Sequence, residues 1–149
     1  MDLIFPSACL VILALLCARS NCREECEELK KKDCLGMALS FNFTTTGIAN
    51  DSQDQNKIEE NLHKWQALRF LPRCWEVLHP LLCGVYKPNC ERGHVRLPCR
   101  SHCLKTRAPC NVVERYHQYG GWPDFLKCGS FPQENCDNFT VRNGLMFTS

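Results

Sequence analysis

The stretch "LPCRSHC", residues 97–103, holds three side chains that could bind a metal ion or take part in thiol chemistry: Cys99, His102 and Cys103. Residues four apart on a helix lie on one face, one turn apart, so both thiols would project together. Two thiolates and an imidazole are ligands that suit Zn²⁺. In the alternative interpretation, each thiol belongs to a disulfide bond. The compartment decides between the two, because disulfides persist in oxidising surroundings.

Residues 1–20 have the pattern of a secretory signal peptide. The apolar core from Cys9 to Ala18 is too short to span a bilayer, and small residues allow cleavage after Ser20. The segment departs from the usual pattern because it carries Asp2 and no Lys or Arg, which leaves an uncleaved anchor as the alternative. We expect the rest of the chain to be secreted, or extracellular and membrane-anchored if the chain is a fragment.

Cysteine is unusually frequent in the expected mature chain. Eleven of the 13 cysteines follow the leader, from Cys22 to Cys136, and this density in a short exported chain predicts a disulfide framework. The closely spaced C-x₂-C pairs of structural zinc sites do not occur. N-glycosylation sequons begin at Asn42, Asn50 and Asn138. Disulfides are therefore favoured over a metal site at residues 97–103, and no metal is expected.

Composition and motifs exclude several classes of function. The 18 basic and 16 acidic residues nearly balance, so no nucleic-acid partner is expected. The chain has no G-x-S-x-G, H-E-x-x-H or glycine-rich phosphate loop, and thiols held in bridges are not nucleophiles. We therefore expect no enzyme and no cofactor, and we expect His102 to be an exposed helix residue.

Hydrophobic periodicity predicts three helices. The first lies within residues 51–75, with a capping box of Ser52 and Gln55 at its start, and Pro72 helps to end it. Its apolar positions recur at spacings of four and three and form one stripe: Ile58, Leu62, Trp65 and Leu68.

The second helix is predicted over residues 73–83, with Pro80 kinking or breaking it, and the third over residues 98–116, with a bend at Pro109. The remaining segments are expected as extended chain or ordered loop: residues 41–46, 84–90 and 119–136. Such a small domain buries little apolar surface, so disulfides worth about 2–4 kcal/mol each would dominate its stability.

The order of ten cysteines resembles the Frizzled-type cysteine-rich extracellular domain: Cys26, Cys34, Cys74, Cys83, Cys90, Cys99, Cys103, Cys110, Cys128 and Cys136. Within that family, the sequence is similar to the Smoothened type in four segments: "CLG" (34–36), "DSQ" (51–53), "PRCWEVLHPLLCGVYKPNCE" (72–91) and "GWPDFLKC" (121–128). The resemblance implies a mainly α-helical, small, disulfide-rich domain over residues 21–136, with three to four helices and short strands. Residues 137–149 would then begin a linker.

The resemblance also implies four disulfides: Cys26–Cys90, Cys34–Cys83, Cys74–Cys110 and Cys103–Cys128. The partner of Cys136 is left open. Frizzled-like domains use the cysteine at the position of Cys99, Smoothened domains use the one at Cys22, and this chain has both. One thiol is left over.

The function implied by the resemblance is binding of a sterol, either cholesterol or an oxysterol, in a shallow apolar groove. Asp51 matches the carboxylate that accepts the sterol hydroxyl, and Trp65 and Leu68 would form a wall. Further matching positions line the rest of the groove: Tyr86, Val112, Trp122, Pro123 and Phe125. The residues alone also allow a different interpretation, in which Asp51 is a solvated residue before the helix and Trp65 is a core residue.

Two functions follow from the resemblance. In the first, the domain belongs to a Smoothened-like transducer of Hedgehog signals, and its partner is the seven-helix membrane domain of the same protein. In the second, the chain is a secreted Frizzled-like decoy that binds acylated Wnt.

Overall fold

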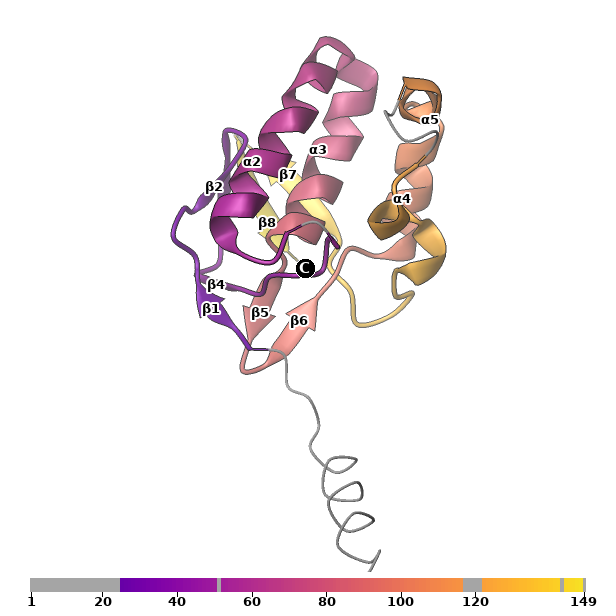
Figure 1. Ribbon diagram of the computed structural model, residues 1–149. Helices are drawn as coiled ribbons and strands as arrows, with labels where there is room; N and C mark the ends of the chain where they lie inside the picture. The colour runs from indigo at the N-terminus through magenta and orange to yellow at the C-terminus, as the bar shows by residue number, and fades with distance from the viewer. Residues whose placement is uncertain (1–24, 51, 117–121, 143, 149) are drawn as a thin grey trace, which may run out of the picture.

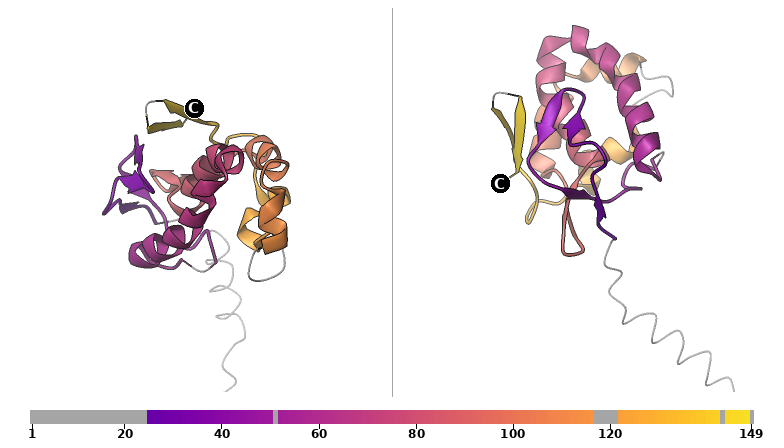
Figure 2. Two further views of the ribbon diagram at one scale, coloured as in Figure 1. Left: turned by 90° about the horizontal axis from the view of Figure 1, so that it is seen from above. Right: turned by 90° about the vertical axis from the view of Figure 1, so that its left-hand side faces the viewer.

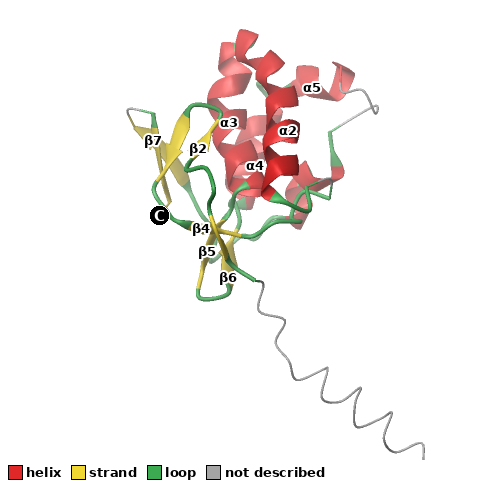
Figure 3. Ribbon diagram, turned by 60° about the vertical axis from the view of Figure 1, so that its left-hand side comes forward, coloured by secondary structure: helices red, strands yellow, loops and turns green. Residues whose placement is uncertain are grey.

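The computed structural model describes residues 25–50, 52–116, 122–142 and 144–148 (Figure 1). The helices gather on one side of the molecule and the short strands on the other (Figure 3). Among the described residues, no helix is long and apolar enough to cross a membrane. The expected signal peptide, Cys22 and Asp51 lie outside the described residues.

The first helix, α2, spans Gln55–Trp65. Asp54 is its N-cap, and the Asp54 carboxylate accepts hydrogen bonds from the backbone N–H groups of Asn56 and Lys57, at 2.9 and 3.0 Å. The predicted capping box of Ser52 and Gln55 is therefore wrong. The Gln55 side chain instead bonds to the backbone of the N-terminal segment, at Glu28 and Lys30.

The first predicted helix ends earlier than expected, at Trp65 rather than near Pro72. The second, predicted over residues 73–83, is confirmed within a longer helix. The chain passes from α2 into a 3-10 helix, η1 (Gln66–Phe70), and then into α3 (Pro72–Tyr86). Pro72 begins α3 rather than ending the previous helix, because the first position of a helix requires no N–H donor.

α3 does not end at Pro80, which lies buried inside it. All residues from Pro80 to Tyr86 are buried, so packing compensates for the backbone hydrogen bond that a proline removes. The predicted bend at Pro109 is confirmed, since it separates α4 (Arg100–Arg107) from α5 (Asn111–Tyr116). Two further 3-10 turns follow, η2 (Asp124–Leu126) and η3 (Cys128–Ser130).

In the part of the chain that the structure describes, the strands form three small sheets. β1 (Glu27–Glu28) pairs with β4 (Phe43–Thr44), and β5 (Asn89–Glu91) pairs with β6 (His94–Arg96), both antiparallel. The largest sheet has the order β2-β3-β8-β7. Its members are β2 (Asp33–Cys34), β3 (Met37–Leu39), β7 (Phe139–Arg142) and β8 (Leu145–Thr148).

The C-terminal segment, expected to begin a linker, forms the β7–β8 hairpin. β8 runs parallel to β3, with Leu39 opposite Met146, and the hairpin stands beside β2 and β3 in the right-hand view of Figure 2. The side chains of Phe139 and Met146 are buried in the core. This segment therefore adds apolar residues to the domain.

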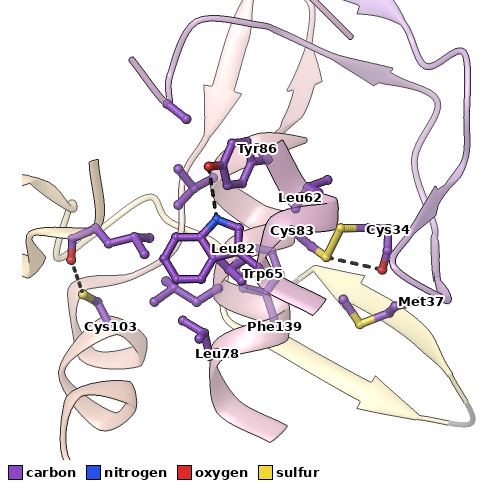
Figure 4. Packing of buried hydrophobic residues seen from close by; sticks show 14 of the residues in the cluster. Cys34, Met37, Leu62, Trp65, Leu78, Leu82, Cys83, Tyr86, Cys103 and Phe139 are labelled. Atoms are coloured by element: carbon purple, nitrogen blue, oxygen red, sulfur yellow. Dashed lines mark hydrogen bonds between the residues drawn. A yellow bond between two sulfur atoms is a disulfide. The ribbon is translucent and has the colours of Figure 1, made fainter. Parts of the chain in front are cut away.

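Five disulfides hold these elements: Cys26–Cys90, Cys34–Cys83, Cys74–Cys110, Cys99–Cys136 and Cys103–Cys128. Four are the pairs implied by the resemblance, and the fifth is the Frizzled-like alternative for Cys136. Around them the core is packed with fully buried leucines, among them Leu62, Leu78 and Leu82 (Figure 4). The structure thus confirms a small, disulfide-rich fold, with four α-helices and short strands among the described residues.

Candidate functional site

Three aromatic side chains from three separate elements meet near the centre of the helical side. Trp65 ends α2, Tyr86 ends α3 and Phe125 lies in η2. The Trp65 indole Nε1–H donates a hydrogen bond to the Tyr86 hydroxyl at 3.3 Å (Figure 4). The Phe125 ring is edge-on to both, with centroids 6.4 Å from Trp65 and 5.4 Å from Tyr86. We call these three residues the aromatic cluster.

The members of the aromatic cluster differ in exposure. Trp65 is 8% exposed and Tyr86 2%, whereas Phe125 is half-buried. Leu68 and Val112 are also half-buried and pack against the core. The buried indole N–H of Trp65 is satisfied, because the phenol oxygen of Tyr86 is its acceptor. The cluster therefore buries no unsatisfied indole donor, and the half-buried Phe125 is its most exposed ring.

Trp122 and Pro123 directly precede η2. Trp122 is buried, and its Nε1–H donates to the carbonyl oxygen of Leu126. The guanidinium of Arg107, from α4, lies over the Trp122 ring, 5.1 Å from its centroid. Pro123 is half-buried. Sequence reasoning missed Arg107, because only the fold brings it over a tryptophan so distant in the chain.

The predicted polar end of the site lies outside the described residues, since it rests on Asp51. Its chain neighbours are described: Asn50 is exposed, and the buried Ser52 hydroxyl accepts a hydrogen bond from Asn61 Nδ2 at 3.2 Å. Asn42 and Asn138, the other predicted glycosylation sites, are also exposed.

His102 is not the exposed helix residue that we expected. It is half-buried, its Nε2 lies 3.2 Å from the carbonyl oxygen of Val77, and its ring is edge-on to Phe139. Burial lowers the pKa of His102, which therefore favours the neutral ring. Its contacts are those of a packing residue.

A different group of potential metal ligands occurs among the described residues. Ligand atoms of Cys34, His79 and Cys83 all lie within 4.8 Å of one another. The two sulfurs are joined in a disulfide, and a bonded sulfur is not a thiolate ligand. The His79 Nε2 also lies 2.8 Å from the Cys34 carbonyl oxygen, within hydrogen-bonding distance. This group is accounted for without a metal.

A shallow hollow near the start of α2 has a different character. Its lining includes charged and hydroxyl side chains, among them Glu27, Lys30, Thr45 and Asp54, and it holds no aromatic ring. Water or a polar group suits such a lining, and an apolar ligand suits the aromatic cluster better.

Comparisons with known proteins agree with this architecture. The Fz domain family model matches residues 26–135. "Protein smoothened" of Gallus gallus is 50% identical over 115 residues, which are 76% of this chain and 14% of that protein. The human protein of that name is 48% identical, with the same coverage. The chain thus spans about 14% of the length of the curated relatives it matches.

A solved structure is similar over the same region. The crystal structure of the xenopus Smoothened cysteine-rich domain in complex with cyclopamine is 47% identical to this chain, with a TM-score of 0.68. The match covers 72% of this chain and 95% of that one.

Proposed function

Because the chain belongs to the Fz domain family and is similar to Smoothened over most of that domain, we propose that it is an extracellular sterol-binding domain of a Smoothened-like Hedgehog transducer. The observation that carries this proposal is the aromatic cluster. A sterol is a rigid, flat hydrocarbon with one hydroxyl group, so it requires an apolar wall and a single well-placed polar partner. Phe125 offers a half-buried apolar ring to such a ligand, and the nearly buried rings of Trp65 and Tyr86 pack against Phe125 at a steep angle.

The residues have different roles in the proposed complex. Trp65 and Tyr86 form the rigid floor, since both are buried and hydrogen-bonded to each other. The half-buried residues would contact the sterol at the rim: Leu68, Val112, Pro123 and Phe125. The proposed acceptor for the hydroxyl of cholesterol or an oxysterol is Asp51. Trp122 supports the rim through η2.

The cyclopamine complex of the xenopus domain supports a ligand of this shape, because cyclopamine is a steroid-like small molecule. In the full signalling protein, we propose that occupancy of the site acts on a seven-helix membrane domain of the same chain. The exposed sequons Asn42, Asn50 and Asn138 agree with an extracellular, glycosylated domain.

One observation favours a second candidate function, capture of acylated Wnt as a secreted Frizzled-like decoy. Cys136 is bonded to Cys99, the pairing expected of Frizzled-like domains rather than of Smoothened. An acyl chain would also suit an apolar wall, so the two functions differ in ligand rather than in the kind of site.

Equilibrium binding of a fluorescent sterol to the isolated chain tests the proposal. We expect saturable binding that Phe125→Ala weakens about tenfold, because the variant removes most of an apolar contact at the rim. Phe43→Ala is the matched control, since Phe43 is 47% exposed in β4 and outside the aromatic cluster. Tight capture of acylated Wnt by a chain that does not bind sterol would reject the first function and favour the second.

A further inference from the structure

The turn between α2 and α3 carries an exposed apolar surface. Phe70 is 89% exposed and Leu71 37%, and Ala67 and Pro72 beside them are exposed as well. We call residues 67–72 the apolar tip. Single exposed hydrophobic residues are ordinary, but here several share one short turn, and no residue of η1 is buried. The tip stands at the top of Figure 1, at the opposite end from the β5–β6 hairpin.

The surroundings of the apolar tip are basic. From Asn61 to Arg73 the chain contains no Asp or Glu, but it contains exposed His63, Lys64, Arg69 and Arg73. His63 and Lys64 lie in the last turn of α2, where a cation stabilises the helix dipole. That explanation fails for Arg73, which lies in the first turn of α3, where the dipole disfavours a cation. The helix dipole therefore does not account for the charge of Arg73.

An exposed aromatic ring on a turn between two arginines is a combination that suits a membrane–water interface. Aromatic side chains partition into the headgroup region, and arginines bind lipid phosphates while their stems remain in apolar surroundings. Leu68, which we place at the rim of the sterol site, belongs to the same turn. A ligand with very low solubility in water must reach its site from a membrane or a carrier, and the tip adjoins the site.

We propose that the apolar tip inserts into the outer surface of a lipid bilayer, with Phe70 and Leu71 among the headgroups and Arg69 and Arg73 on the phosphates. Sterol then passes from the bilayer to the neighbouring aromatic cluster. The second step rests on the proposed sterol function, whereas the insertion itself does not.

Co-sedimentation with sterol-free vesicles tests the insertion. The probe is the isolated chain mixed with vesicles of phosphatidylcholine, with and without phosphatidylserine. We expect Phe70→Ser to lower the partition coefficient for vesicles about tenfold, the loss for one aromatic side chain withdrawn from an apolar environment. Phe43→Ser makes the same chemical change in β4 and is expected to leave binding unchanged. Arg69→Gln and Arg73→Gln are expected to weaken binding about fivefold each, chiefly to vesicles that contain phosphatidylserine.

Two results would overturn the insertion: no vesicle binding by the wild-type chain, or equal losses for Phe70→Ser and Phe43→Ser. Retention on an immobilised sulfated glycan without vesicle binding would also overturn it and assign the tip to an acidic polysaccharide. Sterol uptake separates this inference from the proposed function. Uptake of sterol from a cyclodextrin carrier tests the aromatic cluster alone, whereas uptake from vesicles tests the aromatic cluster and the apolar tip together. Phe70→Ser should therefore lower the ratio of vesicle uptake to carrier uptake.

Discussion

Asp137 is a buried carboxylate next to the last disulfide. Its side chain is 0% exposed, and it forms an ion pair with Arg96 Nε at 3.2 Å. Neither of its oxygens accepts a geometrically good hydrogen bond from a described residue. Burial raises the pKa of Asp137, and Glu91 adds to this, while Arg96 acts in the opposite direction. The carboxyl group therefore binds its proton more tightly in the folded than in the unfolded chain.

This difference predicts the pH dependence of stability. A raised pKa in the folded state means that Asp137 contributes stability below its unfolded pKa of about 3.9, and that the contribution is lost as the pH rises through the folded value. We expect Asp137→Asn to remove this loss, so that its free energy of unfolding declines less than that of the wild type from acidic to neutral pH. Chemical denaturation across that range measures it. Parallel curves for variant and wild type would show that another group is responsible.

At the residue scale, the sequence predicted which residues come together better than it predicted how their side chains contact one another. The resemblance named Trp65, Tyr86 and Phe125 as site residues, and the structure brings them together. It did not predict that Trp65 donates a hydrogen bond to Tyr86, since that geometry depends on how α2 and α3 cross. Arg107 over Trp122 had no local signal either. Pairwise contacts between distant segments are set by tertiary packing rather than by periodicity.

Among the elements, the β7–β8 hairpin docks against α3 through one close approach. A Cβ atom at Gly84 would lie 2.3 Å from the Phe139 ring, so only glycine leaves room for that ring. Phe139 comes from a segment beyond the residues matched by the family model. Gly84 thus permits the C-terminal hairpin to pack on the helix that carries Tyr86.

We expect Gly84→Ala to lower the free energy of unfolding by about 1–3 kcal/mol, because overpacking at this point displaces the Phe139 ring. Gly129→Ala is the matched control: an added Cβ there meets nothing within 4 Å, so a change within about 0.5 kcal/mol is expected. Urea denaturation of both variants measures the difference. If Gly84→Ala is as stable as the control, the hairpin does not depend on this contact.

Helix existence was predictable from the sequence, but helix boundaries were not. The stripe of Ile58, Leu62 and Trp65 lies on the buried face of α2 as predicted. The helix ended early because the chain turns at η1, and Pro72 was compatible with either an end or a start. The capping box failed because Asp54 is a better-placed cap than Ser52.

On the scale of the whole molecule, the disulfides join segments that are far apart in the sequence. Cys99–Cys136 joins the N-cap of α4 to the residue before Asp137, and it closes a loop with a sequence separation of 37. We expect Cys99→Ser to cost about 2–4 kcal/mol of stability, and Cys22→Ser to leave the five bonds intact. Disulfide mapping and denaturation measure these effects. A wild-type bond between Cys22 and Cys136 would contradict the pairing described above.

The position of a bound sterol is measured most directly by photoaffinity labelling. The isolated chain is mixed with a photoreactive cholesterol analogue, irradiated, digested and sequenced by mass spectrometry, with excess unlabelled cholesterol as the control for specificity. We predict competed labelling on the peptides that contain Trp65 with Leu68 and Pro123 with Phe125. Competed labelling confined to the polar hollow around Thr45 and Asp54, or labelling that cholesterol does not compete, would contradict the account.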